Sequence, residues 1–214
     1  MRRVLLKIYA VFSLSMFLAP SMSPAQEVAK HAKPVIALQP LGKCSAAEIE
    51  QAKKGILALY ACEVKIAPGQ ALPQTAFYSP RSRYRADKLL RFLESEVKLD
   101  FECVKIVGLT QKDISFTKGE VYDWGIFGLG SLDGKTCVIS TFRLGAGKAD
   151  DAKKMQRLIK VINHEIGHTF GLEHCPAKGC LMQDAQGTIK TVDEENGEFC
   201  EECHKRLEKV LKVK

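Results

Sequence analysis

Aromatic residues are scarce in this sequence of 214 residues: they make up 7% of it, and there is one tryptophan. Proteins that bind single-stranded nucleic acid stack bases on aromatic side chains, so the scarcity argues against that class. The formal net charge of +7 does not come from a basic stripe, because lysine and arginine are scattered along the chain. We therefore expect no nucleic-acid partner.

Long hydrophobic runs are missing as well. The apolar run at residues 8–19 holds twelve residues, whereas a transmembrane helix needs about 20. With 46% hydrophobic and 27% charged residues, the composition excludes a disordered chain, a collagen-like fibre and a multi-pass membrane protein. It is typical of a folded domain with a sizeable core.

Acidic residues are absent from residues 1–25, and the order of features there is typical of a secretory signal. A cationic start precedes the apolar run, and Ser23 and Ala25 place small residues just before Gln26. We predict a cleaved signal peptide over 1–25 and an exported protein, periplasmic or secreted, with no stable membrane insertion after cleavage. An uncleaved membrane anchor is the alternative.

The rest of the chain mixes helix and strand patterns. Residues 26–43 lack periodicity and are predicted to be a linker, followed by one domain over 44–214. Ser45 and Glu48 form a capping box that starts a helix. The other elements expected are strands near 62–66, 101–109 and 136–141, and helices after Pro80, from 150 or 151 to about 170, and near 201–212. This order favours an α/β domain with a small C-terminal lobe from about 172.

Three of the five histidines lie close together, at His164, His168 and His174. Residues four apart share one face of a helix, so the first two can bind a single ion. Gly171 can adopt positive φ and turn the chain so that the third joins them. Three imidazoles leave one position open on Zn²⁺, as in a catalytic site. Glu165, next to the first ligand, can then act as general base toward a water molecule.

Four cysteines follow in two close pairs, Cys175 with Cys180 and Cys200 with Cys203. This spacing predicts a tetrahedral Cys₄ zinc site. Such a metal would stabilise a lobe that has little apolar mass of its own. We therefore expect two zinc ions per chain, one catalytic and one structural. Two local disulfides or a redox pair are the alternative, since an exported protein meets an oxidising environment.

The combined spacing resembles that of the archaemetzincins, a branch of the metzincin zinc peptidases. Their signature is HExxHxxGxxHC, four residues, Cys, x, Met, seventeen residues and CxxC, and residues 164–203 follow it with every gap matching. The resemblance implies an α+β zincin-like fold, with a twisted mixed sheet and an active-site helix. It implies the same zinc ligands and the same base, and it makes Met182 the methionine of the turn beneath the histidines. The residues alone favour a gap-filler in the core at Met182, and the resemblance reverses that preference.

The glycine-rich segment 124–129 is expected to be an edge strand or bulged ribbon, because glycine weakens a central strand. The resemblance implies an edge strand that binds extended peptide, and this segment is the candidate. An ordinary glycine-rich hairpin is the alternative.

Four further cysteines lie outside the signature: Cys44, Cys62, Cys103 and Cys137. Export favours two disulfides among them, in one of three pairings. The alternative is four buried free thiols.

The sequence therefore predicts a zinc-dependent peptidase that hydrolyses peptide bonds in a peptide or protein substrate. The resemblance favours aminopeptidase-like cleavage of small peptides. Two alternatives stay open: a zinc-binding module with a vestigial peptidase site, and a zinc amidohydrolase that acts on a non-peptide amide. Neither the substrate nor the oligomeric state follows from the sequence.

Overall fold

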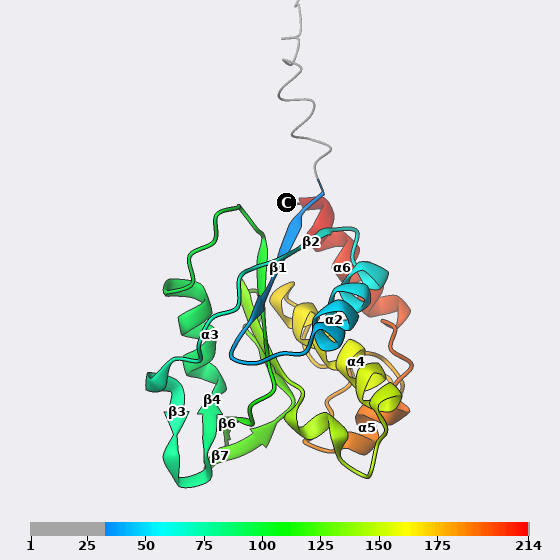
Figure 1. Cartoon of the computed structure of the whole chain (residues 1–214). Helices are drawn as coiled ribbons and strands as arrows, with labels where there is room; N and C mark the ends of the chain where they lie inside the picture. Colours follow the sequence, from blue (N-terminus) through cyan, green and yellow to red (C-terminus); the bar gives the residue numbers. More distant parts are fainter. Residues whose placement is uncertain (1–32, 214) are drawn as a thin grey trace, which may run out of the picture. The chain divides into compact units, whose positions relative to one another are not determined.

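A five-stranded mixed sheet forms the centre of the computed structural model, which describes residues 33–213 (Figure 1). Its strand order is β2-β1-β5-β9-β8, in which the first four strands are parallel and β8 runs antiparallel to β9. The strands are β1 (Val35–Pro40), β2 (Glu63–Ile66), β5 (Lys105–Thr110), β8 (Gly128–Gly130) and β9 (Thr136–Ser140).

A second sheet of four strands lies beside the first and has the order β3-β4-β6-β7. Its strands are β3 (Phe77–Tyr78), β4 (Arg83–Arg85), β6 (Ile114–Lys118) and β7 (Val121–Ile126). The chain passes from β7 into β8 through Phe127 alone, so one glycine-rich segment supplies an edge strand to each sheet. The expectation of an edge ribbon at 124–129 is confirmed.

Helices cover both faces of the five-stranded sheet. The α-helices are α2 (Ala46–Leu59), α3 (Ala86–Ser95), α4 (Asp151–Thr169), α5 (Ile189–Glu194) and α6 (Glu201–Val213), and the short 3-10 helices are η1 (Gln74–Ala76), η2 (Ser79–Arg81) and η3 (Phe142–Gly145). In Figure 1, α3 lies on one side of the sheet, and α2 and α4 lie on the other. Parallel strands covered in this way are buried on both faces, and every residue of β5 and β9 is buried.

Alternate residues of the central strands pack into two separate cores. Leu38 and Val107 belong to the core shared with α2 and α4, while Ala37 and Ile106 belong to the core shared with α3. Successive side chains of a strand point to opposite faces, so each strand contributes to both cores. The zincin-like α+β architecture is confirmed in outline, although the sequence did not indicate the second sheet.

The N-terminal part of the predicted linker 26–43 lies outside the described residues, and the rest corrects the prediction. Val35–Pro40 forms β1, which pairs with both β2 and β5. The compact unit accordingly begins at Lys33 and not at residue 44. A strand buried on both faces shows no alternation of polar and apolar residues, and six residues are too few to reveal another period.

Two further boundaries differ from the predictions. The strand expected over 101–109 begins at Lys105, and Val104, 44% exposed, lies in the loop before it. The helix expected after Pro80 begins at Ala86, because Tyr84 belongs to β4. The capping box of α2 and the Asp150 cap of α4 are confirmed, with side-chain bonds to the backbone N–H groups of Glu48 and Lys153.

The disulfides predicted among the four outer cysteines are not present, since Cys44, Cys62, Cys103 and Cys137 are all free. Cys44 donates its thiol hydrogen to the carbonyl of Leu109 at 3.1 Å. Burial raises the pKa of the Cys62 thiol to about 11 and that of Cys137 well above its ordinary value. These two thiols act as small apolar side chains of the core.

The predicted signal peptide lies outside the described residues. Within residues 33–213, no helix is both long and apolar enough to cross a membrane.

Candidate metal centre and substrate cleft

The long helix α4 carries the first two predicted histidine ligands on one face. His164 and His168 are one turn apart, and their Nε2 atoms lie 3.0 Å from each other. Nitrogen ligands of tetrahedral zinc, each about 2.0–2.1 Å from the metal, are separated by roughly 3.3 Å. The pair is therefore at the spacing that one zinc ion requires.

The C-terminus of α4 delivers the third histidine. Gly171 has φ +85° and its N–H donates to the carbonyl of His168, while the N–H of Leu172 donates to that of Gly167. These two bonds form a Schellman motif, which ends the helix and reverses the chain. His174 thereby returns to the histidine pair, and the ligand nitrogens of the three rings lie within 4.8 Å of one another.

Backbone carbonyls fix the orientation of the first two rings. Nδ1 of His164 donates to Leu181 at 2.7 Å, and Nδ1 of His168 donates to Leu172 at 2.7 Å. With the proton held on Nδ1, each Nε2 keeps a free lone pair for a metal. Burial lowers the pKa of His164 to about 3 and also lowers that of His168, which favours the neutral, metal-binding form of both rings. Zinc fits this donor set.

Glu165 lies against the edge strand β8 and lines the same cavity as the histidines. It is 7% exposed, and burial raises the pKa of its carboxyl to about 8, partly opposed by a hydrogen bond from the backbone of Gly130. A Cβ atom on Gly128 would lie 2.6 Å from Cγ of Glu165. The absence of a side chain at position 128 is what allows Glu165 this position.

The four signature cysteines form a second cluster, in which all four sulfur atoms lie within 4.8 Å of one another. Sγ of Cys175 is 3.7 Å from that of Cys200, and Sγ of Cys180 is 3.8 Å from that of Cys203. Sulfurs around tetrahedral zinc are about 3.8 Å apart. The backbone hydrogen bond at Cys203 is the main cause that lowers the pKa of the Cys200 thiol to about 7, which favours a thiolate. The cluster fits zinc.

The segment around Met182 lies between the two clusters. Met182 is fully buried, and its Sδ is 2.6 Å from where a Cβ atom on Gly167 would lie, so it packs directly against α4. Its carbonyl accepts the N–H of Cys175, and its own N–H donates to Sγ of Cys180. This turn therefore contacts both the histidine helix and the cysteine cluster.

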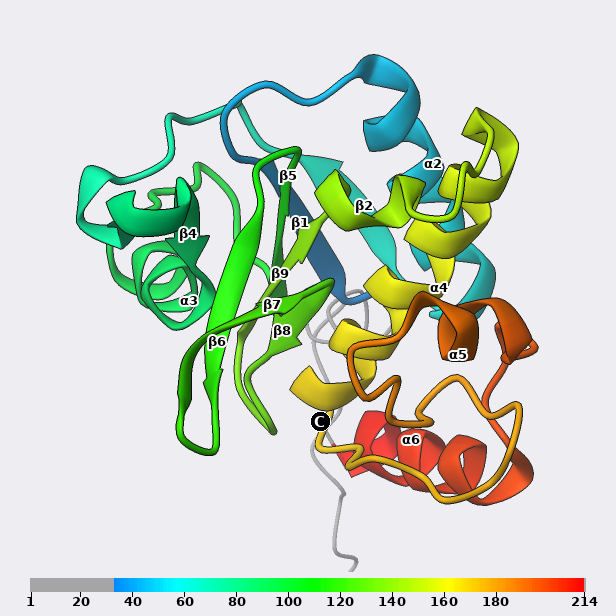
Figure 2. The ribbon, with the colours of Figure 1, turned by 90° about the horizontal axis from the view of Figure 1, so that it is seen from below.

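A cavity of about 670 Å³ opens in front of the histidines. The outer edge of β8, which pairs with no other strand among residues 33–213, forms one side of it. Figure 2 shows β8 beside the C-terminal half of α4. Apolar side chains of the β6–β7 hairpin and the following segment extend this wall: Phe116, Trp124, Ile126, Phe127 and Leu132. The three predicted histidine ligands, the predicted base and the predicted edge strand thus surround one cleft.

Comparison with known protein families identifies this arrangement. Residues 46–209 match the model of Peptidase family M54. The chain belongs to this family. The M54 match covers every helix described above from α2 to α5 and most of α6, together with all seven predicted metal ligands. The chain is accordingly a zinc metallopeptidase of the archaemetzincin type.

Curated M54 relatives align along most of their length. The archaemetzincin of Haloquadratum walsbyi is 32% identical over 180 residues, which are 81% of this chain and 99% of that protein. The archaemetzincin of Pyrococcus horikoshii is 36% identical over 166 residues, which are 73% of this chain and 84% of that protein.

Solved M54 structures share the fold. The crystal structure of archaemetzincin from Methanopyrus kandleri has a TM-score of 0.72 at 27% identity and covers 86% of this chain and 98% of its own. The crystal structure of archaemetzincin from Archaeoglobus fulgidus, complexed with malonate, has a TM-score of 0.67 at 29% identity. It covers 80% of this chain and 99% of its own.

Several residues of this M54 cleft were not found by sequence reasoning. Gly128 and Gly167 are positions of close approach, and a glycine inside a strand can indicate such an approach. The carbonyls of Leu172 and Leu181 carry no side-chain signal at all. Glu195 lines the cavity and is 7% exposed, yet in the sequence it is one of several acidic residues in a row.

Proposed function

We propose that Glu165 is the general base of this metallopeptidase and that the histidines hold the one catalytic zinc. The observation that carries the proposal is the position of Glu165, which lines the cavity beside His164 and His168 and lies under the edge of β8. A carboxyl group whose pKa is raised toward neutrality is well suited to accept and return a proton. Burial raises the pKa of Glu165 to about 8.

The chain's own residues then have distinct tasks. Zinc, when bound, acts as a Lewis acid that polarises a carbonyl group and acidifies water. Glu165 accepts a proton from the attacking water and delivers it to the leaving amine. The unpaired edge of β8 aligns an extended peptide through main-chain hydrogen bonds, as in other cases of strand addition. His164 and His168 keep their Nε2 atoms turned to the metal position through their Nδ1 bonds.

The second zinc of our proposal is structural and is held by the cysteine cluster. Four sulfurs at tetrahedral spacing, two of them buried, leave no place for a substrate. Metal analysis of the purified chain tests this proposal, and two zinc ions per chain are expected. One zinc ion together with a disulfide within the cluster would contradict it.

Short peptides are the proposed substrates, with cleavage near the N-terminus. A cavity of about 670 Å³ is of the size that holds a small molecule or a few residues. Assays that compare free and acetylated peptides of increasing length test both parts of this proposal. Rapid cleavage inside long acetylated peptides would contradict it.

Export is a separate proposal, supported by the order of charges and apolar residues in 1–25. N-terminal sequencing of the protein recovered from its natural compartment is expected to begin at Gln26. An intact Met1 on a cytoplasmic protein would contradict the proposal, and an intact Met1 on a membrane-bound protein would indicate an uncleaved anchor.

The decisive test of the peptidase mechanism is Glu165→Gln. We expect the variant to bind as much zinc as the unmodified protein and to lose about 10²–10⁴-fold in kcat/KM. Glu50→Gln, an exposed substitution on α2, is the matched control and keeps full activity. Unchanged hydrolysis by Glu165→Gln would reject the mechanism. Full zinc occupancy without hydrolysis of any peptide would favour a binding module, or a zinc amidohydrolase if non-peptide amides are cleaved.

A further inference from the structure

A second carboxyl group lines the catalytic cavity, and it has no task in the mechanism above. Glu195 follows the last residue of α5 and is 7% exposed. Among residues 33–213, its carboxyl oxygens have neither an ion-pair partner within 4.0 Å nor a hydrogen-bond partner. Burying an ionised carboxyl without a partner is costly, and a cationic ligand in the cavity would supply that partner.

The neighbouring acidic residues show how unusual Glu195 is. Asp193 forms a two-pronged hydrogen bond with Arg157, at 2.8 Å on each side. Glu194 points to solvent and lies 3.6 Å from Lys190. Of these three consecutive acidic residues, only Glu195 lines the cavity, and its carboxyl forms no ion pair with another residue of 33–213.

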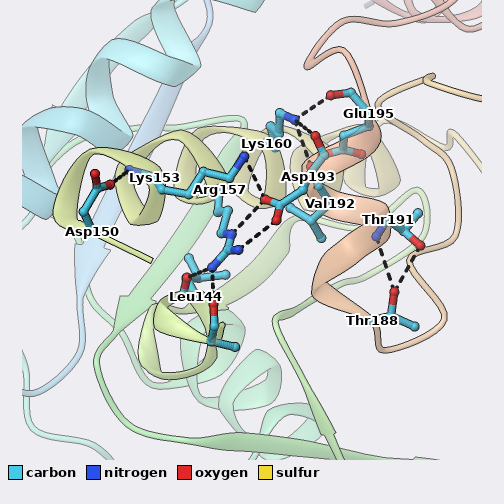
Figure 3. Close-up of polar contacts among 11 residues, drawn as sticks. Leu144, Asp150, Lys153, Arg157, Lys160, Thr188, Thr191, Val192, Asp193 and Glu195 are labelled. Carbon is cyan, nitrogen blue, oxygen red and sulfur yellow. Dashed lines mark hydrogen bonds and ion pairs between the residues drawn. The ribbon is translucent and has the colours of Figure 1, made fainter. Parts of the chain in front are cut away.

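Lys160, the nearest cation, is already engaged. Its Nζ donates to the backbone carbonyls of Val192 at 2.8 Å, Asp193 at 3.3 Å and Glu195, as Figure 3 shows at the end of α5. An ammonium group has three donors, and these three carbonyls use all of them. Burial raises the pKa of the Glu195 carboxyl to about 8, although the positive charge of Lys160 acts to lower that pKa.

The charges around the cavity favour a positively charged ligand. Four acidic side chains line it: Glu165, Glu173, Asp184 and Glu195. Lys118 is the one lysine or arginine among the described lining residues, and it lies over the ring of Trp124. The protein as a whole carries a net charge of +7, so the acidic character is specific to the cleft. Burial alone raises the pKa of Glu165 and Glu195 to about 8, and a cation bound in the cavity favours their ionised form, which in turn attracts the cation.

The walls near Glu195 suit the stem of a long basic side chain. Val161 lies three residues before His164 on α4, about one helical turn from the histidine site. Val192 lies three residues before Glu195, and both valines line the cavity. A lysine or arginine side chain can pack its methylene groups on such residues while its charged end reaches a carboxylate.

We propose that Glu195 is the end of a specificity pocket that binds the cationic group of a peptide substrate. The proposal rests on the proposed peptidase function and specifies its substrate class. The ligand is an ammonium or guanidinium group, supplied by the side chain of a residue next to the cleaved bond or by the free N-terminus. Glu195 contacts this group and takes no part in proton transfer.

The test measures binding in the zinc-loaded Glu165→Gln protein, so that no hydrolysis is needed. Titration calorimetry compares acetylated peptides that differ only in lysine or norleucine at one position. We expect the lysine peptide to bind about 10-fold tighter or more, as for a hydrogen bond to a charged group. A norleucine peptide with a free N-terminus, compared with its acetylated form, shows whether the α-amine is the ligand instead.

Glu195→Gln in the same background removes the charge and keeps the shape. The preference for the cationic peptide is expected to fall to less than about 2-fold, whereas Glu194→Gln, the adjacent control, keeps it. Glu195→Lys is expected to reverse the preference toward a glutamate peptide. An unchanged preference in Glu195→Gln, or no preference for either cation in the protein that keeps Glu195, overturns the proposal. If the protein prefers the cationic peptide in binding but the unmodified protein hydrolyses no peptide, the peptidase function is refuted and the proposal of a cation-binding pocket stands.

Discussion

Nδ1 of His164 donates to the backbone carbonyl of Leu181 at 2.7 Å, and Leu181 lies in the chain between Cys180 and Met182. One end of this three-residue segment belongs to the cysteine cluster, and the other packs against α4 at Gly167. The carbonyl that fixes the tautomer and direction of the His164 ring is therefore held in place by the cysteine cluster. Outer hydrogen bonds of this kind tune the affinity and orientation of metal ligands.

Removing a cysteine ligand should consequently affect both sites. In Cys203→Ser we expect the loss of one zinc ion per chain and of at least about 3 kcal/mol of stability, because metal binding contributes folding energy. That loss corresponds to a Tm lower by about 6–12 °C. Peptidase activity should fall as well, through the weaker hold on His164. Metal analysis, thermal unfolding and a peptide assay check these outcomes. Cys103→Ser, outside the cluster, is the control and should retain both zinc ions.

Gly128→Ala should impair catalysis more than stability. The new methyl group would lie 2.6 Å from Cγ and 2.7 Å from Oε1 of Glu165, and the flexible carboxyl arm can move away more easily than the strand. A displaced base should lower kcat/KM by about 10²-fold, the smaller end of the contribution of a general base. Peptide kinetics and circular dichroism measure the two effects. Gly145→Ala has nothing within 4 Å of the new Cβ and should behave as the unmodified protein; comparable kinetics for the two variants would refute this role of Gly128.

Gly167→Ala should destabilise the protein although alanine is the better helix former. In a helix interior, alanine is favoured over glycine by about 1 kcal/mol, but here its Cβ would lie 2.6 Å from Sδ of the buried Met182. Overpacking costs about 1–3 kcal/mol, so we expect a net loss of about 1 kcal/mol in urea unfolding. In the Met182→Ala background the same substitution should become neutral or stabilising. An additive double mutant would show that the two residues do not press on each other.

Glu48 should contribute stability at neutral pH that acid removes. Burial alone would raise its pKa, but hydrogen bonds from Lys154, Gln111 and the backbone of Ser45 together lower it to about 2 from an unfolded value of 4.5. A lowered pKa stabilises the folded state fully above about pH 4.5, and the contribution disappears as the pH falls toward 2.

The matching variant is Glu48→Gln, which should be less stable by about 2–3 kcal/mol at pH 7. The difference from the unmodified protein should shrink by about 1 kcal/mol between pH 5 and pH 3.5. Urea unfolding at both pH values measures it. A difference that does not change over this range would show that the carboxylate charge is not the source of the stability.

The features that the sequence predicted correctly depend on residues near one another in the chain. The cap of α2, the cap of α4 and the turn at Gly171 are each set within a few residues. The two histidines of α4 share a face because the helical period is fixed. The matching gaps of residues 164–203 are of the same kind, which is why the family was visible in the sequence.

Other features depend on contacts across the sequence, and no local pattern encodes them. The prediction of a linker at β1 is wrong because a strand buried between two parallel neighbours shows no alternation of polar and apolar residues. The prediction of disulfides among the outer cysteines is wrong, because the spacing of cysteines in the sequence does not show where Cys62 and Cys137 lie in the core. The role of Gly128, which leaves room for Glu165, depends on the contact between β8 and Glu165, and these residues are far apart in the sequence.

The sequence by itself determined the donor atoms, because metal chemistry follows from residue type and short-range spacing. Only the tertiary structure decided what surrounds those donors: the carbonyl behind His164, the glycine beneath Glu165 and the buried carboxyl of Glu195. Each of these depends on the distance between atoms that lie far apart in the chain, and that distance is set by the packing of α4 against β8 and of α5 against α4.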